Sequence, residues 1–141
     1  MAHQQLVKAI YDKNEAAALE LVDAVVAAGD LEKLSDPPEG RTPLEEAALF
    51  NMRQLCEKLL EKGAVCIKEG GDPKALFCAV EAGAPDTVEV LVGPSAAALG
   101  WKFRGIYTAL ATAMELDEER EEQKAAFERI VACLKAAGAP M

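Results

Sequence analysis

The sequence predicts an all-α protein, a solenoid of stacked helix-turn-helix units joined by finger loops. Two observations carry this prediction. Apolar residues recur at helical spacing between helix-capping signals, and this arrangement returns about every 33 residues along the chain. The composition agrees, because half of the residues are apolar and only 5% are aromatic. At 141 residues, the chain is long enough for about four such units in one domain.

We place the units at residues 1–34, 35–67, 68–100 and 101–141 of a single domain, 1–141. The first unit is divergent, as a terminal unit of a stack is expected to be. Its first helix covers residues 4–12, with an inner face formed by Leu6, Val7, Ala9 and Ile10. Asn14 then breaks or caps the chain before a second apolar helix, which stops at Gly29. Gly63 follows 34 residues later at the same place in the second unit.

The second unit is the most regular of the four. Thr42 is a good helix N-cap, Pro43 suits the first helical turn, and Glu45 completes a capping box. Asn51 is expected to end this helix and to cap the next one. Gly63 is expected to end the second helix in a left-handed conformation. Two helices of this length cannot bury their apolar faces alone, so neighbours of the same shape are needed.

This second unit resembles the ankyrin repeat. Ten residues match the family pattern in register: Gly40, Thr42, Pro43, Leu44, Ala47, Ala48, Leu59, Leu60, Gly63 and Ala64. Glu45 stands where the family has a histidine that bonds the adjacent turn, and Asn51 stands in place of the glycine between the helices. The resemblance implies an ankyrin-repeat solenoid that binds a protein partner on a concave surface of finger tips and first-helix ends.

The third and fourth units follow the same pattern with deviations. In the third, Leu76 lies 32 residues after Leu44, Pro85 starts the second helix, and that helix ends early. The fourth opens at Thr108 and carries an acidic insertion over residues 117–127. This insertion is expected either to lengthen the two helices or to form a loop. The resemblance thus extends over nearly the whole chain, strongest in the second unit and weakest in the first.

Composition and motifs argue against an enzymatic activity, nucleic-acid binding and membrane insertion. The formal net charge of −9 disfavours a sequence-independent nucleic-acid binder. No phosphate-binding glycine motif is present, no small-molecule substrate or cofactor is suggested, and His3, the only histidine, lies on the N-terminal tail far from a nucleophile. We therefore expect a protein that is not an enzyme. No apolar run approaches the roughly 20 residues of a membrane helix, so membrane insertion is not expected.

The four cysteines are read as free thiols. Cys56, Cys78 and Cys133 fall in helical patterns and are expected to be buried, whereas Cys66 follows a helix and could be exposed. No two cysteines form a C-x-x-C motif and the chain has a single histidine, so a structural zinc site is not expected. Free thiols without a signal-peptide pattern favour an intracellular, cytoplasmic protein.

Candidate partner-binding residues follow from the resemblance and from unusual apolar positions. They are Pro37, Pro38, Arg41, Leu49, Phe50, Trp101, Phe103 and Arg104. Two adjacent large apolar residues, Leu49 and Phe50, occupy slots that are usually polar or mixed. Trp101 and Arg104 belong to the third finger, the loop over residues 95–104, and tryptophan and arginine are typical interface anchors. The competing readings are structural: Phe50 could pack under a neighbouring loop, and the third finger could fold back to bury Trp101 and Phe103.

The leading functional hypothesis is a non-catalytic interaction module, an adaptor or scaffold for a protein partner. The alternative is a small structural subunit built constitutively into a large multiprotein assembly. A third and weaker hypothesis is an acidic inhibitor that mimics nucleic acid, for which partner binding should depend strongly on salt.

Overall fold

The chain forms helices and no strand in the residues that the computed structural model describes, 2–35, 40–102 and 108–140. This confirms the predicted all-α class. The α-helices are α1 (Ala2–Tyr11), α2 (Glu15–Ala27), α3 (Pro43–Leu49), α4 (Arg53–Glu61), α5 (Lys74–Ala82), α6 (Pro85–Val92), α7 (Ala109–Glu119) and α8 (Lys124–Ala136). Three short 3-10 turns connect them: η1 (Glu69–Gly71), η2 (Ala96–Ala98) and η3 (Glu121–Gln123).

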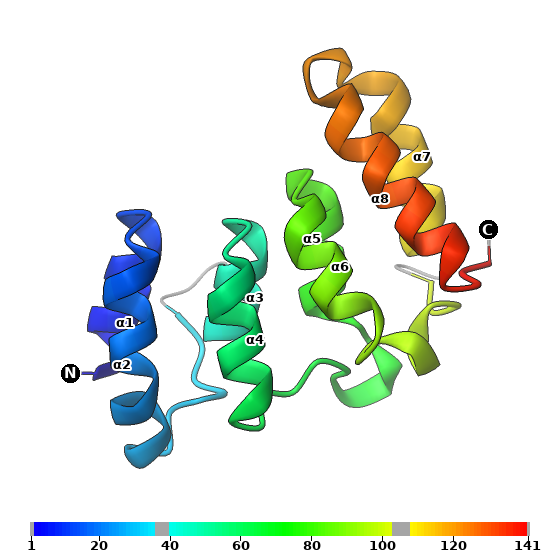
Figure 1. Ribbon diagram of the computed structural model, residues 1–141. Coiled ribbons are helices and arrows are strands. Elements are labelled where there is room, and N and C mark those ends of the chain that lie inside the picture. The colour runs from blue at the N-terminus through cyan, green and yellow to red at the C-terminus, as the bar shows by residue number, and fades with distance from the viewer. Residues whose placement is uncertain (1, 36–39, 103–107, 141) are drawn as a thin grey trace.

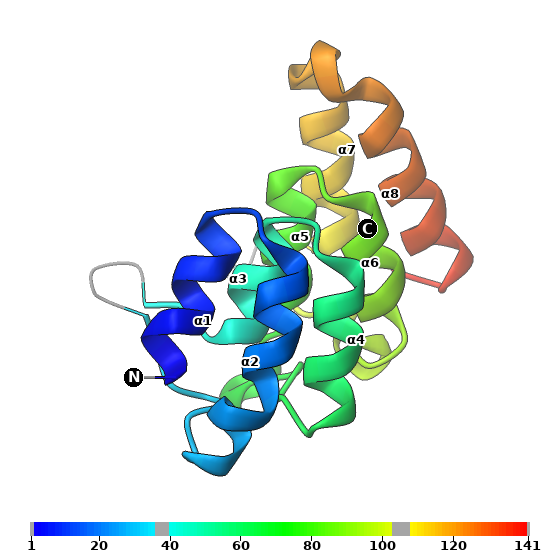
Figure 2. The same cartoon turned by 60° about the vertical axis from the view of Figure 1, so that its left-hand side comes forward.

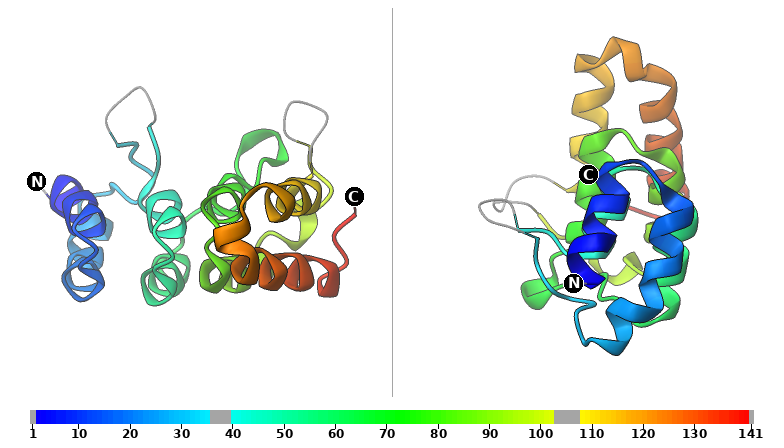
Figure 3. Two further views of the ribbon diagram at one scale, coloured as in Figure 1. Left: turned by 90° about the horizontal axis from the view of Figure 1, so that it is seen from above. Right: turned by 90° about the vertical axis from the view of Figure 1, so that its left-hand side faces the viewer.

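Consecutive helices pair as hairpins, and the hairpins stand side by side from the N-terminus to the C-terminus (Figure 1). The odd-numbered helices form one row, in which α3 contacts α1 and α5, and α5 contacts α7. The even-numbered helices form a second row, as the neighbouring α2 and α4 show in Figure 2. The segments that join the pairs project on the side of the odd-numbered row (Figure 3). That side therefore combines helix surface with loops.

One continuous apolar core runs between the two rows. Its largest fully buried apolar side chains are Leu6, Ile10, Leu44, Leu55, Leu59, Leu76, Leu91, Phe127, Ile130 and Leu134. Val7, which the sequence pattern placed on the inner face of the first helix, is only half-buried. His3 takes a core-side position instead, at 3% exposure within α1. The expectation of a histidine on a tail is wrong, because α1 already begins at Ala2.

The capping box of the second unit is confirmed. The Glu45 amide donates to Thr42 Oγ1 at 3.3 Å, and the Thr42 amide donates to Glu45 Oε1 at 3.1 Å. Pro43 occupies the first helical turn, where its missing N–H costs nothing. Three local residues therefore fix where α3 begins.

Asn51 does not cap the helix that follows it. That helix, α4, has Met52 at its N-cap position and no side-chain cap. Asn51 is left-handed, with φ of 58°, and its Oδ1 accepts a hydrogen bond from the Thr87 amide of α6 at 3.2 Å. Glu15 of α2 serves α4 in the same way, because its Oε2 accepts from the Leu55 amide at 3.2 Å. The amides at the starts of α4 and α6 are thus capped by side chains of the preceding pair, and these caps join neighbouring units.

The acidic insertion of the last unit, residues 117–127, lengthens the two helices and does not form a long loop. Helix α7 continues to Glu119, and α8 starts at Lys124 directly after η3. The turn between them closes the end of α5: Arg120 Nη1 donates to the Glu81 carbonyl at 2.6 Å, and Gln123 Nε2 to the Ala82 carbonyl at 3.4 Å. The α7–α8 pair consequently rises beyond its neighbours in Figure 1.

Charged side chains form a ladder across the even-numbered row. Arg129 of α8 contacts Glu89 of α6 at 2.7 Å, and Arg53 of α4 contacts the same carboxylate at 2.9 Å. The hydrogen bond from Arg129, followed by that from Arg53, lowers the pKa of Glu89 below its ordinary value of 4.5. The ladder is largely exposed, so salt should screen it.

A titration should report this ladder directly. Because the pKa of Glu89 is lowered in the folded state, its contribution to stability is present above pH 4.5 and is lost as the pH falls through the lower folded value. In NMR titrations, the carboxyl carbon of Glu89 should shift below pH 4.5, and Arg129→Gln should move that midpoint back toward it. An unchanged midpoint in the variant would show that the Arg129 contact does not persist in solution.

No helix in the described part of the chain is both long enough and apolar enough to cross a lipid bilayer.

Candidate functional site

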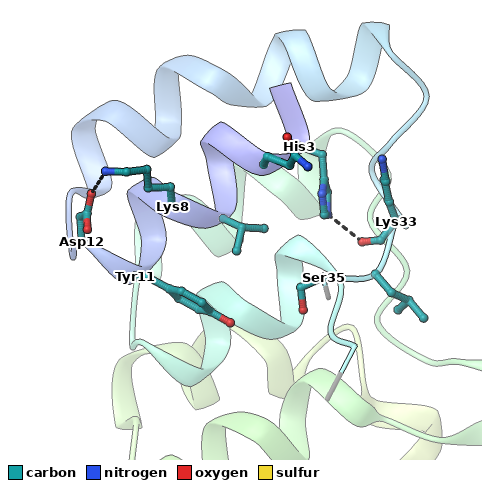
Figure 4. A pocket seen from close by; sticks show the side chains of 9 residues that line it. His3, Lys8, Tyr11, Asp12, Lys33 and Ser35 are labelled. Carbon is teal, nitrogen blue, oxygen red and sulfur yellow. Dashed lines mark hydrogen bonds and ion pairs between the residues drawn. The ribbon is translucent and has the colours of Figure 1, made fainter. Parts of the chain in front are cut away.

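A groove of about 490 Å³ opens between α1 and the segment that leads into the second unit. Its lining residues are His3, Gln4, Val7, Lys8, Tyr11, Asp12, Lys33, Leu34 and Ser35. Figure 4 shows Tyr11 from α1 and Ser35 from the loop with their hydroxyls turned toward one another. The lining residues belong to α1 and to residues 33–35, so the groove lies on the side of the odd-numbered helices. Figure 3 shows that the joining segments project on this side.

Helical spacing explains the α1 wall. His3, Val7 and Tyr11 are four residues apart, so they share one face of the helix. His3 Nε2 donates to the Lys33 carbonyl at 3.0 Å, which ties the loop to the first turn of α1. At the other end of the helix, Lys8 Nζ pairs with Asp12 Oδ2 at 2.9 Å. One wall is therefore rigid helix, and the opposite wall is loop held by a histidine.

Behind the groove lies a buried carboxylate, Glu46 of α3, with no exposed surface. Its Oε1 accepts three hydrogen bonds, from Tyr11 Oη at 3.0 Å, Ser35 Oγ at 3.1 Å and Arg41 Nε at 3.2 Å. These donors come from α1, the loop and the turn before α3. The sequence-predicted binding residue Arg41 is thus engaged by a carboxylate within the fold. Its guanidinium helps to hold the groove together.

The Tyr11 hydroxyl remains a donor in this network. Burial raises the pKa of Tyr11 above its ordinary value, and the hydrogen bond to Glu46 raises it further, against a smaller opposing effect of Arg41. The phenol is therefore protonated at neutral pH and donates to the carboxylate. This hydrogen bond holds the Tyr11 side chain in place at the wall of the groove.

Glu45 makes the corresponding link to the third unit. It is 1% exposed, and its carboxylate lies 3.0 Å from Lys68 Nζ and 3.5 Å from Lys74 Nζ. Lys68 lies in the second finger, the loop over residues 65–73, and Lys74 begins α5. A carboxylate therefore joins adjacent units at the position where the resembled family has its histidine. Glu45 and Glu46, neighbours in sequence, reach in opposite directions along the stack.

Leu49 and Phe50 lie at the end of α3 and are both half-buried. The Phe50 ring packs against Tyr11, with ring centroids 5.4 Å apart and an interplanar angle of 43°. Phe50 is therefore partly covered by a helix of the first unit, whereas the structural alternative had placed it under a neighbouring loop. Through Tyr11, the end of α3 adjoins the groove.

Trp101 lies elsewhere, against the second finger. Its Nε1 donates to the Gly70 carbonyl at 3.0 Å, and its ring meets Phe77 edge-on with centroids 5.6 Å apart. The side chain is half-buried, as expected if the third finger folds back. The remaining predicted residues, Pro37, Pro38, Phe103 and Arg104, lie outside the described part of the chain.

None of the nine residues that line the groove was among the predicted partner-binding residues. Leu34 is 53% exposed and Tyr11 47% exposed, the highest values among large apolar residues that the structure describes. The signal for the α1 wall was present as the four-residue spacing of His3, Val7 and Tyr11. It was hidden because Val7 also fits the apolar core pattern of the same helix.

The thiols offer no reactive centre. Cys66 is buried rather than exposed, and its Sγ lies 3.0 Å from Ser95 Oγ. Cys78 and Cys133 are half-buried, less than the helical pattern predicted. Burial raises the pKa of Cys56, Cys66 and Cys133, and raises that of Cys78 to about 12. Thiols in this state are weak nucleophiles at neutral pH. Within the described ranges, no group of histidine, cysteine or acidic residues is arranged to hold a metal ion.

No protein-family model, curated protein or solved structure matches this chain.

Proposed function

We propose that this chain is an ankyrin-type repeat module that binds a protein partner and carries out no chemistry of its own. The binding surface is the side of the odd-numbered helices, from the groove beside α1 to the end of α3. In this proposal the even-numbered helices support the odd-numbered ones and do not contact the partner.

Two features support the repeat assignment. The first is the succession of helix pairs in two rows, with the joining segments on one side. The second is the burial of the motif residues: Leu44, Ala47 and Ala48, which match the family pattern, are all buried at 1% exposure or less. Small residues at these positions allow neighbouring first helices to approach closely.

The observation that carries the binding proposal is that the two most exposed large apolar residues of the described chain lie together. Leu34 and Tyr11 share the groove, and Tyr11 packs on Phe50, beside Leu49. Exposed apolar surface in a cluster marks interaction sites more often than scattered residues do. Tyrosine is also enriched among residues that dominate binding energy.

Replacing Leu49 with glutamate should weaken partner binding at least tenfold while leaving the helical content unchanged. Leu49 is half-buried at a helix end, so a charge there is tolerated by the fold but not by an apolar interface. The partner is first identified by cross-linking and mass spectrometry of native extract, and affinity is then measured with both proteins purified.

The matched control is Val26→Glu, which places the same charge at a 37% exposed position on α2, in the opposite row. This variant should bind as the native chain does. Equal binding by all three proteins would refute the assignment of the surface. Circular dichroism melts of each variant separate loss of binding from loss of fold.

A further inference from the structure

The groove beside α1 is open to solvent and has room for several side chains. Its volume of about 490 Å³ falls in the range of pockets that hold small ligands or short peptide segments. The hydrogen bond from His3 to the Lys33 carbonyl fixes one wall, and the Glu46 network fixes Tyr11 and Ser35 on both sides. The site is therefore preformed, which lowers the entropic cost of binding.

One part of the groove is apolar. Val7 is half-buried, and Tyr11 and Leu34 expose about half of their surface into or beside the groove. Covering these three side chains would remove apolar area from water, so an occupant gains from an apolar side chain of its own.

The charge of the groove differs from that of the chain. The chain has a formal net charge of −9, yet two lysines and one aspartate line this groove. Asp12 is paired with Lys8 at 2.9 Å (Figure 4). Among the described residues, Lys33 has no ion-pair partner. Glu46 lies behind the wall, fully buried and in contact with Arg41. The unpaired charge at the groove is therefore positive.

From this complementarity we infer that the groove binds an acidic peptide segment of the partner, one that pairs a carboxylate with Lys33 and places an adjacent apolar side chain against Val7 and Leu34. The inference rests on the proposed function and specifies the chemistry of the segment that is bound. A basic peptide is the competing occupant, since Asp12 also lines the groove.

A random heptapeptide display library, selected on the immobilised full-length chain, tests this inference. Selected peptides should be enriched in aspartate and glutamate next to a large apolar residue. Their dissociation constants are then measured by fluorescence anisotropy against the native chain and against Lys33→Glu. The substitution should weaken binding about tenfold or more, and raising the salt concentration should weaken binding to the native chain.

The matched control is Lys135→Glu, which makes the same charge change at an exposed position near the end of α8. It should bind the selected peptides as the native chain does. Leu34→Ser tests the apolar wall and should also weaken binding, without a large effect on the fold, because Leu34 is 53% exposed. Thermal melts of all variants check folding.

Three results would overturn the inference: selection of lysine- and arginine-rich peptides, no selection above background, or equal affinity for the native chain and Lys33→Glu. The inference and the proposed function can fail separately. Peptides or a partner that respond to Leu49→Glu but not to Lys33→Glu would leave the module intact and reject the groove. Acidic peptides that require Lys33, together with a partner indifferent to Leu49→Glu, would retain the groove and reject the broader surface.

Discussion

Glu46→Ala should destabilise the protein by about 2–4 kcal/mol, among the largest effects of any single substitution here. The carboxylate is fully buried, and its removal leaves Tyr11, Ser35 and Arg41 without their common acceptor. Removing the buried member of a charge-assisted hydrogen-bond network costs more than the net value of a single hydrogen bond. The measurement is urea unfolding monitored by circular dichroism.

Glu46→Gln is the informative control. All three donors bond Oε1, whereas Oε2 accepts no hydrogen bond among the described residues. A glutamine can keep an oxygen at the first position and put its amide at the second, so it should lose clearly less stability than alanine. Glu57→Ala, at an exposed pair with Arg53, should cost less than about 1 kcal/mol. Equal losses for alanine at positions 46 and 57 would contradict the network.

Phe127→Ala should cost about 3–5 kcal/mol and should act mainly on the last helix pair. Phe127 of α8 is fully buried and packs against the end of α5, where its ring would lie 3.2 Å from a Cβ atom at Gly83. The Arg120 guanidinium lies 5.8 Å from the centre of the same ring. The side chain therefore joins α8, the α7–α8 turn and the preceding pair.

The expected pattern is regional, because α7 and α8 contact each other most and, outside their own pair, contact mainly α5 and α6. Hydrogen exchange should show lost protection in residues 109–136, with much smaller changes in α1 to α4. Phe127→Leu, which leaves a smaller cavity, should have the same pattern at lower amplitude. A uniform loss of protection over all the helices would indicate a single cooperative unit instead.

Local signals were the most predictable part of the fold. The capping box of Thr42 and Glu45 involves residues three apart, so the chain encodes it without help from elsewhere. The start of α6 at Pro85 is local for the same reason. The helical class and the starts of α3 and α6 therefore followed from spacing and from local start signals, whereas the start of α1 and the cap of α4 did not.

Long-range partners could not be predicted in this way. Glu46 is in an exposed-looking helical sequence, yet donors 5, 11 and 35 residues away converge on it. His3 donates a hydrogen bond to the carbonyl of Lys33, 30 residues further on. Trp101 donates one to the carbonyl of Gly70, 31 residues earlier. Each outcome depends on which segment lies opposite in the stack. The groove is missed for the same reason, because it is made by two segments that the sequence separates.

Asn51 limits how freely a unit of this stack could be exchanged. The left-handed backbone at this position would suit glycine at least as well. A glycine, however, has no side chain to accept from the Thr87 amide or to donate to Asp86 Oδ2 at 3.2 Å. If the second unit were moved elsewhere in the stack, the Asn51 side chain would move with it. It would find equivalent partners only where the second helix of the next unit begins as α6 does. Recombination of such units is thus restricted to compatible neighbours, and the order of the units is itself part of the information in the chain.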